Sequence, residues 1–410
     1  MLGAIADDFT GATDLATMLR RSGHRVAVVI EDAALAARAF DDIDAIVIAL
    51  KTRTAPVADA VSSSLGALER LRSWGADRFY FKYCSTFDST DTGNIGPVLD
   101  ALSGALAARR TIVVPSLPAN GRTVYEGHLF VGSDLLENSP MRHHPLTPMT
   151  RSRVADILRP QTDRGVAEVF HPAVRAGVDG LTAALAEAEE PYVVVDAIDD
   201  DDLAVVAVAV RDDVLVSGGS GLALGIRGPG HPDSAWQAPS DGGRLVLCGS
   251  VSAATRRQIE VAAAASAPVR VVDLDRAAAD TDAEVRSIVA WVREQRGGSA
   301  PIVCAARTLD DVRETVGGVP TAPLVESVLS AVAARSVASG EVSALIVAGG
   351  ETSGAVVRAL GVAALHIGPE LAPGVCWATT TVGDSAVALA LKSGNFGADD
   401  LFLRAWEKLA

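Results

Sequence analysis

Short runs of β-branched and other apolar residues alternate along the first half of this chain with longer alanine-rich stretches. The stretches 58–74 and 98–108 carry apolar residues at helical spacing, as expected of helices that connect strands. Strands that alternate with helices predict a parallel sheet flanked by helices. The runs that we assign to strands are 26–30, 45–50, 78–82, 111–115 and 192–196, and the tract 217–221 closes the series.

A tract rich in glycine, proline and serine, residues 227–243, interrupts this pattern and is typical of a linker. A second α/β series follows it, with strand-like runs at 244–248, 269–274, 302–305, 344–348 and 378–382. A chain of 410 residues is also too long for one ordinary core. We therefore expect an α/β fold of two domains, residues 1–235 and 236–410, each with a mainly parallel sheet flanked by helices.

Composition narrows the class of protein. The chain has 51 acidic and 36 basic residues, a net charge of −15, and no long basic tract, which argues against a nucleic-acid partner. No apolar run reaches the roughly 18 residues of a membrane span, and the N-terminus has no basic leader, so we expect no membrane partner and a cytoplasmic location. The four cysteines are scattered, which favours buried thiols over a zinc site or disulfides.

Two adjacent carboxylates, Asp7 and Asp8, end the first apolar run and precede Thr10 and Gly11. Ligands of open α/β sheets bind beyond the carboxyl ends of strands, so these acids are candidates for a binding site. The structural alternative is that Asp8 or Thr10 caps a following helix. We favour function for the pair, because one carboxylate suffices for a cap and two adjacent charges repel unless a cation or polar ligand lies between them.

Polar clusters follow other strands of the first series, at 51–54, 82–86 and 118–123. Arginine offers fork geometry to a carboxylate, and aspartate accepts hydrogen bonds from hydroxyl groups. These clusters, together with Asp7 and Asp8, predict a site for a small polyol that carries a carboxylate. The interruption at 125–148 predicts a folded loop over this crevice, and its adjacent His143 and His144 do not have the spacing of a metal site.

Three turns rich in glycine and serine follow strands of the second series, at 249–252, 349–354 and 392–397. Glycine lets backbone N–H groups approach a phosphate, and a following helix N-terminus adds a favourable dipole. Each turn alone is a weak signal, and none matches a Walker A or GxGxxG pattern. Three such turns in one domain predict a site for nucleotide phosphates.

These motifs together resemble the four-carbon acid sugar kinases, in order and across both domains. The motifs that carry the resemblance are 5–12, 51–53, Lys82, 120–123, 144–149, 349–354 and 392–397. The segment 391–397 near the C-terminus and the loop 144–149 look most like the 3-oxo-tetronate kinases, although threonate and erythronate kinases share most other motifs. The resemblance implies an N-terminal domain that binds the sugar acid, a C-terminal domain that binds ATP, and an active site in the cleft between them.

Carried over residue by residue, the resemblance implies a substrate site, a nucleotide site and a Mg²⁺ ion whose ligands stay unassigned. The substrate site comprises Asp8, Arg53, Lys82, Asn120, Gly121 and Arg122, and the nucleotide site comprises Ser250 or Ser252, Gly349, Gly350, Glu351, Thr352, Ser353 and Gly394. To these sites we add Ser85, from the strand-end cluster that contains Lys82, and Asn395, from the glycine turn that contains Gly394. The expected reaction is in-line attack of the C4 hydroxyl on the γ-phosphoryl group. Asp7 or Asp8 is the candidate catalytic residue that orients the hydroxyl or takes its proton.

Two other classes of protein compete with a kinase. A two-lobed sugar-acid receptor needs no nucleotide, so the three glycine turns would be coincidence. An NAD-dependent dehydrogenase would be expected to show GxGxxG after its first strand, where this chain has Asp-Asp-Phe-Thr-Gly. The sequence does not determine the oligomeric state and is compatible with a homo-oligomer.

Overall fold

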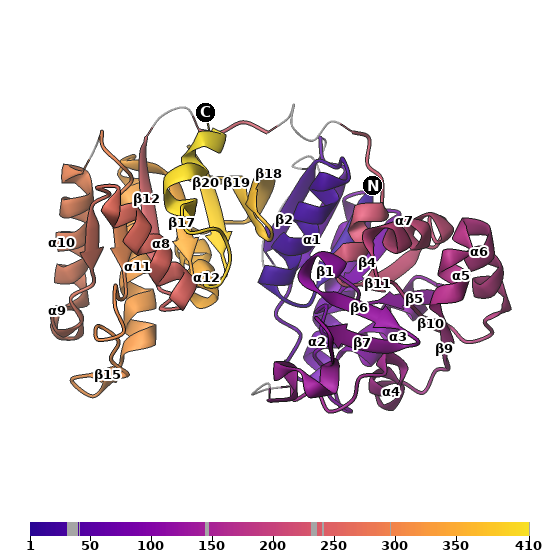
Figure 1. Ribbon diagram of the computed structural model, residues 1–410. Helices are drawn as coiled ribbons and strands as arrows, with labels where there is room; N and C mark the ends of the chain where they lie inside the picture. Colours follow the sequence, from indigo (N-terminus) through magenta and orange to yellow (C-terminus); the bar gives the residue numbers. More distant parts are fainter. Residues whose placement is uncertain are drawn as a thin grey trace. The chain divides into compact units, whose positions relative to one another are not determined.

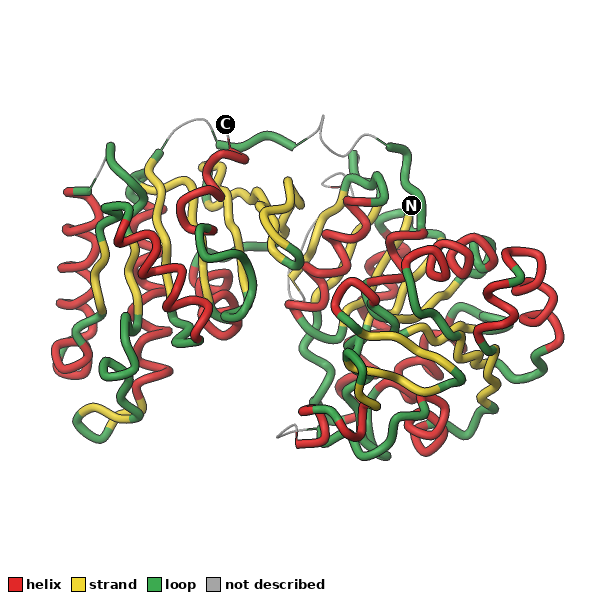
Figure 2. The backbone as a smooth tube through the Cα atoms, in the orientation of Figure 1, coloured by secondary structure: helices red, strands yellow, loops and turns green. Residues whose placement is uncertain are grey.

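The computed structural model describes residues 1–30, 40, 42–143, 147–230, 236–239, 242–295 and 297–409. The chain divides into two compact units, Met1–Pro232 and Asp233–Ala410. Each unit contains strands of a central sheet with helices packed against it (Figures 1 and 2).

The sheet of the first unit consists of parallel strands in the order β2-β3-β1-β4-β11-β5-β10-β9. Its strands are β1 (Leu2–Ala6), β2 (Val26–Ile30), β3 (Ala45–Ala49), β4 (Arg78–Lys82), β5 (Thr111–Val114), β9 (Val166–Val169), β10 (Tyr192–Val195) and β11 (Leu215–Gly218). The helices are α1 (Phe9–Arg21), α2 (Val57–Ser73), α3 (Ile95–Ala105), α4 (Val154–Leu158), α5 (His171–Arg175), α6 (Gly177–Glu187) and α7 (Asp200–Ala209). Each of the five predicted strand runs coincides with a strand of this sheet.

The order of the strands determines where a ligand is expected. The chain moves from β1 through α1 to β2 in one direction along the sheet, and from β3 through α2 to β4 in the opposite direction. Right-handed crossovers therefore place α1 and α2 on opposite faces. The point where the direction reverses is the usual ligand site of such sheets, at the carboxyl ends of the strands. Here that point is the end of β1 and its neighbours β3 and β4.

The interruption predicted at 125–148 is folded, with its own small sheet. β6 (Arg122–Tyr125), β7 (His128–Val131) and β8 (Asp134–Leu135) pair antiparallel, and the short 3-10 helices η3 (Leu136–Asn138) and η4 (Pro140–His143) follow. His144 and residues 145–146 lie outside the described residues. That this segment covers the crevice stays a prediction.

The second unit has the strand order β13-β14-β12-β17-β20-β19-β18. Its strands are β12 (Gly243–Cys248), β13 (Val269–Val271), β14 (Ile302–Cys304), β17 (Val342–Ala348), β18 (Ala364–Ala372), β19 (Val375–Val382) and β20 (Ser385–Lys392), with a small hairpin of β15 (Thr315–Val316) and β16 (Val319–Pro320). Its helices are α8 (Ala253–Ala264), α9 (Leu274–Ala279), α10 (Thr281–Glu294), α11 (Thr321–Ala338), α12 (Gly350–Ala359) and α13 (Leu401–Arg404). The sheet is parallel from β13 to β20.

One strand of the second series differs in direction from its predicted neighbours. The run 378–382 falls within β19, which pairs antiparallel with both β18 and β20. Its connections are short turns, which can join only antiparallel strands. The direction reverses because this part of the chain has no crossover helix.

The core of the second unit forms where α8 and the C-terminal α13 pack on the sheet. Trp377 on β19 is fully buried and lies 5.4 Å from Trp406, measured between ring centroids. Its indole nitrogen donates a 2.9 Å hydrogen bond to the carbonyl of Ala405, which satisfies the polar atom of a buried aromatic residue. None of the helices that the structure describes is both long enough and apolar enough to cross a membrane.

Candidate active site

Sheet register brings the predicted strand-end clusters of the first unit together. Ala6 on β1 pairs with Ala49 on β3 and with Lys82 on β4, and Lys82 pairs in turn with Gly218 on β11. The residues that follow these positions therefore leave the same edge of the sheet side by side. This is why Asp7, Asp8 and Arg53, far apart in sequence, come into contact.

Arg53 is the cation that lies between the two carboxylates. Its Nε and one terminal nitrogen donate to the two oxygens of Asp7 at 2.9 and 2.8 Å. Its other terminal nitrogen lies 2.9 Å from Oδ2 of Asp8. Burial raises the pKa of the Asp7 carboxyl, and the charge and hydrogen bonds of Arg53 oppose that rise. A guanidinium thus relieves the repulsion expected between the adjacent acids.

The N-cap of α1 is Asp8. Oδ1 of Asp8 accepts a 2.6 Å hydrogen bond from the backbone N–H of Gly11, whereas Thr10 is exposed. The capping interpretation is therefore correct for Asp8 and wrong for Thr10. Asp8 combines the cap with the Arg53 contact, so the structural and functional interpretations of this residue do not exclude each other.

Lys82 is buried at the end of β4, and its ammonium donates a 2.7 Å hydrogen bond to the carbonyl of Tyr83. The ammonium is electrostatically coupled to Asp7 and to Asp14 on α1. A Cβ atom on Gly11 would lie 3.3 Å from this ammonium, so the glycine lets the helix start close to it. The positive charge of Lys82 is therefore balanced by nearby carboxylates.

Asp14 and Ser220 belong to this cluster and were not predicted as site residues. The Ser220 hydroxyl donates to Asp14, and burial raises the pKa of the Asp14 carboxyl, an effect that Lys82 and Ser220 oppose. Ser220 follows β11, which is the sheet neighbour of β4. The signal in the sequence was the polar tract that closes the first strand series, but its position in the sheet was unknown.

Asn94 supports the loop that carries Arg53, and no motif in the sequence had singled it out. Its side-chain amide is buried and donates to the carbonyl oxygens of Thr52 and Ala55 at 2.6 and 2.8 Å, with the Arg53 carbonyl at 3.4 Å. One amide therefore fixes the backbone on both sides of Arg53. Asn94 is a positioning residue for the guanidinium.

The other predicted substrate residues lie at the same edge of the sheet but outside this network. Ser85 follows β4 and lies near Gly219, because a Cβ atom added to Gly219 would be 3.5 Å from the Cβ atom of Ser85. Asn120 is exposed at the end of the 3-10 helix η2 (Pro118–Asn120), and Gly121 adopts the left-handed conformation, φ 68°. The Arg122 guanidinium bonds to the Asn120 carbonyl, while its Nε is buried without a hydrogen-bond partner among the described residues. The described contacts do not link this turn to Arg53.

The three glycine turns of the second unit meet around one cavity of about 590 Å³. The sheet register explains why the turns meet, because Ala348 on β17 pairs with Cys248 on β12 and with Lys392 on β20, at the points where the turns begin. The cavity is lined by the predicted residues Ser250, Gly349, Gly350, Glu351, Thr352 and Gly394. The start of α12 at Gly350 directs its free backbone N–H groups to this place, as in other phosphate sites.

The turns approach so closely that side chains are excluded at two glycines. A Cβ on Gly249 would lie 1.9 Å from the hydroxyl oxygen of Thr352, and a Cβ on Gly394 would lie 2.2 Å from the hydroxyl oxygen of Ser250. Gly349 has φ 126°, a conformation that side chains rarely adopt. Glycine is therefore required here by both space and backbone conformation.

Of the two serines of the first turn, Ser250 lines the cavity and Ser252 does not. Ser252 caps α8 by accepting from the N–H of Thr255, and its hydroxyl donates a 2.7 Å hydrogen bond to the carbonyl of Gly394. Ser353 is also buried away from the lining, and Asn395 is exposed and outside it. The geometry thus separates predicted residues that face the cavity from residues that shape it.

The cavity continues from the turns to a more apolar wall that the sequence did not predict. Its lining there comes from α9, the loop after β14 and α11, with Leu274, Ala306, Val312, Pro320, Ala322 and Val325. Asp311, Arg313, Glu314 and Glu326 add charge at this end. A polar, glycine-rich end joined to an apolar wall suits a ligand that has phosphates at one end and a ring at the other.

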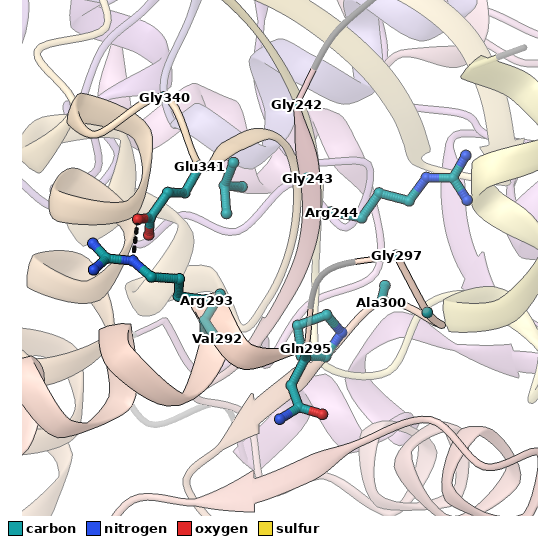
Figure 3. A pocket seen from close by; sticks show the side chains of 13 residues that line it. Gly242, Gly243, Arg244, Val292, Arg293, Gln295, Gly297, Ala300, Gly340 and Glu341 are labelled. Carbon is teal, nitrogen blue, oxygen red and sulfur yellow. Dashed lines mark hydrogen bonds and ion pairs between the residues drawn. The ribbon is translucent and has the colours of Figure 1, made fainter.

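A second cavity of about 580 Å³ lies at the amino ends of β12 and β17, at the opposite edge of the same sheet (Figure 3). Figure 3 shows Glu341 facing Arg293, with which it forms an ion pair. Helices α10 and α11 end near this cavity, so their negative dipole ends lie there. That polarity disfavours a phosphate, and we do not assign the nucleotide to this cavity.

No group of three or more histidine, cysteine or acidic side chains that could hold a metal ion occurs in the described ranges. The cysteines are free thiols, of which three are buried and Cys84 is half-buried.

Comparison with known proteins finds two family models that match successive parts of the chain. Residues 2–226 match the family described as a sugar-binding N-terminal domain, and residues 245–402 match a nucleotide-binding C-terminal domain. The chain is 45% identical to a 3-oxo-tetronate kinase of Burkholderia multivorans and 44% identical to one of Pseudomonas savastanoi pv. phaseolicola, in each case over 100% of this chain and 97% of the relative. A crystal structure from Salmonella typhimurium LT2 superposes with a TM-score of 0.91 at 40% identity, covering 98% of each chain.

Proposed function

The chain belongs to the family of 3-oxo-tetronate kinases, and from that premise we propose that it phosphorylates the 4-hydroxyl of 3-oxo-tetronate with ATP. The observation that carries this proposal is the cavity of the second unit, where three glycine turns and the start of α12 converge. A sugar-acid receptor would have no use for such a cavity.

We assign residues 1–235 to the sugar acid and residues 236–410 to the nucleotide. In the second unit, Ser250, Gly349, Gly350, Thr352 and Gly394 would surround the phosphates, with backbone N–H groups as the main donors. The apolar wall at Leu274, Val312 and Val325 would pack on the base. Since ATP is the donor, we expect the enzyme to act in the cytoplasm.

In the first unit, we assign different roles to the carboxylates of Asp7 and Asp8. Both carboxylate oxygens of Asp7 accept hydrogen bonds from Arg53, and only 7% of the Asp7 side chain is exposed. Asp8 keeps 32% of its side chain exposed, so we assign Asp8 to the acceptor hydroxyl and Asp7 to holding Arg53. Lys82, Ser85 and the 120–122 turn complete the proposed sugar-acid site, with Arg53 or Lys82 facing the substrate carboxylate or the transferring phosphoryl group.

In the proposed reaction, Asp8 orients the C4 hydroxyl and accepts its proton as the hydroxyl oxygen bonds to the γ-phosphorus. The bond between that phosphorus and the β–γ bridging oxygen breaks, and ADP leaves. The enzyme's contribution is positioning and charge neutralisation, because phosphoryl transfer involves little covalent chemistry by the protein.

Glu326 and Glu351 both line the nucleotide cavity and fit a role beside Mg²⁺. Burial and the nearby charge of Glu351 raise the pKa of the Glu326 carboxyl, so a hard cation would relieve the repulsion between them. A bound Mg²⁺ ion would supply neutralisation of phosphate charge. The two glutamates would hold the ion against the cavity wall.

A coupled assay of ADP release tests the proposal with four acceptors: 3-oxo-tetronate, D-threonate, L-threonate and D-erythronate. We expect turnover with 3-oxo-tetronate and little with the other acids. Turnover confined to a threonate or to erythronate would replace the substrate and keep the kinase. Absence of ADP release with all four, while Mg-ATP still raises the melting temperature, would reject the substrate class alone.

A further inference from the structure

Lys392 is a buried cation whose charge is balanced by no acid among the residues that the structure describes. It ends β20, and only 1% of its surface is exposed. Its ammonium donates to the Thr255 hydroxyl at 3.1 Å and to the Gly394 carbonyl at 3.2 Å, and it lies 5.8 Å from the centroid of the Phe402 ring. None of the ion pairs formed by the described residues involves Lys392.

Such an arrangement is costly for the protein without a ligand. A buried charge is normally paired, because neutral hydrogen bonds only partly replace its hydration. The groups that face the ammonium are the Thr255 hydroxyl on α8, the Gly394 carbonyl, the Phe402 ring on α13 and the Cys248 thiol on β12. Burial lowers the pKa of Lys392 to about 8, and Cys248 opposes that shift.

The buried lysine of the first unit behaves differently. Lys82 also ends a parallel strand and is buried, but it is coupled to the carboxylates of Asp7 and Asp14. The two lysines therefore occupy similar positions in the two sheets with opposite surroundings. The missing negative charge is a specific property of the Lys392 site.

Lys392 lies directly behind the wall of the nucleotide cavity. The carbonyl of Gly394 accepts from Lys392, from Ser252 at 2.7 Å and from Thr255 at 2.8 Å. Gly394 itself lines the cavity beside Ser250. Three donors thus fix the carbonyl on the inner side of the turn, so the turn presents its other side to the cavity.

We propose that Lys392 is a positioning residue whose ammonium serves as the counter-charge of the bound nucleotide phosphates and holds the Gly394 turn against them. This inference rests on the proposed nucleotide site. It has two consequences. Binding of the phosphates should stabilise the protonated form of the lysine, and removal of the lysine should weaken binding of the nucleotide without weakening binding of the sugar acid.

The test is calorimetric titration of the full chain with Mg-AMP-PNP, an ATP analogue that is not hydrolysed, in two buffers of different ionisation enthalpy. At pH 8 about half of the lysine is deprotonated, so binding should take up as much as about half a proton per nucleotide. Uptake should vanish near pH 7, where the ammonium is already formed. Uptake that does not change with pH would overturn the inference.

Two variants separate a charge-balancing lysine from a merely structural one. Lys392→Met should weaken AMP-PNP binding by about tenfold to a hundredfold and abolish proton uptake, since hydrogen bonds to charged groups contribute that much. Thr255→Val removes a partner of the same ammonium but keeps the charge, so proton uptake should persist. Exposed Lys408 in the same unit provides the control Lys408→Met, which should change neither quantity.

The outcomes distinguish the inference from the function on which it rests. If the wild type does not bind AMP-PNP at all, the proposed nucleotide site is wrong. If the wild type binds it without proton uptake, only the role of Lys392 is wrong. Should Lys392→Met fail to fold, the pH dependence of uptake in the wild type still decides the question.

Discussion

The guanidinium of Arg53 holds the Asp7 carboxylate through two parallel hydrogen bonds of 2.9 and 2.8 Å, across 46 positions of sequence. The pair joins the carboxyl ends of two neighbouring strands, β1 and β3. Neither group is therefore free in the unliganded protein. A substrate carboxylate that uses Arg53 must share it with Asp7 and Asp8.

Removing Arg53 should destabilise the protein strongly, because Asp7 would remain as a buried charge without a partner. We expect Arg53→Ala to lower the free energy of unfolding by about 3 to 5 kcal/mol. In Asp7→Asn/Arg53→Ala the loss should be smaller than the sum of the two single losses, since the buried charge is gone. Urea unfolding of the four proteins measures this coupling, and additive losses would show that the pair is not energetically linked.

Asn94 offers a way to disturb Arg53 without touching it. Asn94→Ala leaves the carbonyl oxygens of Thr52 and Ala55 without their donor, which should cost about 1 to 3 kcal/mol of stability. The loop that carries Arg53 should loosen, so the KM for the sugar acid should rise while the KM for ATP stays constant. Exposed Asn138 supplies the control Asn138→Ala. Equal changes in both KM values would indicate general loss of structure instead.

The sequence predicted which residues come together better than it predicted what they do there. Strand ends of a parallel sheet meet at one edge, so the convergence of Asp7, Arg53 and Lys82 followed from the order of strands and helices alone. The Arg53 fork on Asp7 did not follow, since it depends on register and side-chain direction. The sequence also left the cap open between Asp8 and Thr10, because an aspartate and a threonine are both good caps and only backbone geometry separates them.

In the second unit the glycine turns were predictable and the burial beneath them was not. Glycine at 249, 349 and 394 signalled close backbone approach, and the cavity that they line agrees with that signal. Lysine is seldom buried, so nothing in the sequence distinguished Lys392 from an exposed lysine. Likewise, the run 378–382 has the composition of any buried strand, and composition does not encode the antiparallel direction that short connections impose on it.

Substitution at Gly394 should impair nucleotide binding selectively. The new methyl group of Gly394→Ala would lie 2.2 Å from the Ser250 hydroxyl oxygen, so the turn or the serine must move. We expect a cost of about 1 to 3 kcal/mol, seen as a higher KM for ATP with the sugar-acid KM unchanged. Gly298→Ala is the matched control, since its Cβ would meet only one atom, at 3.9 Å. An unchanged KM for ATP in Gly394→Ala would argue against this turn as part of the nucleotide site.

Cys84, which follows Tyr83 at the end of β4, should react unusually slowly for a half-buried thiol. Burial, with the nearby charge of Asp88, raises the pKa of Cys84 from the ordinary value of 9.0 to about 11. Since the thiolate is the reactive form, its fraction at pH 8 should be about a hundredfold below that of an ordinary cysteine. The rate of iodoacetamide labelling should then rise about tenfold per pH unit from 8 to 10 without levelling off.

Mass spectrometry of the labelled peptide would follow Cys84 separately from the buried cysteines, and unfolded protein gives the reference rate. Asp88→Asn provides the test of cause: removing that charge should lower the pKa of the thiol and speed labelling at pH 8. Arg53 and Lys82 oppose the shift in the native protein, so Arg53→Ala should slow labelling further if it stays folded. A labelling rate that levels off near pH 9 would mean that the thiol is not perturbed by this site.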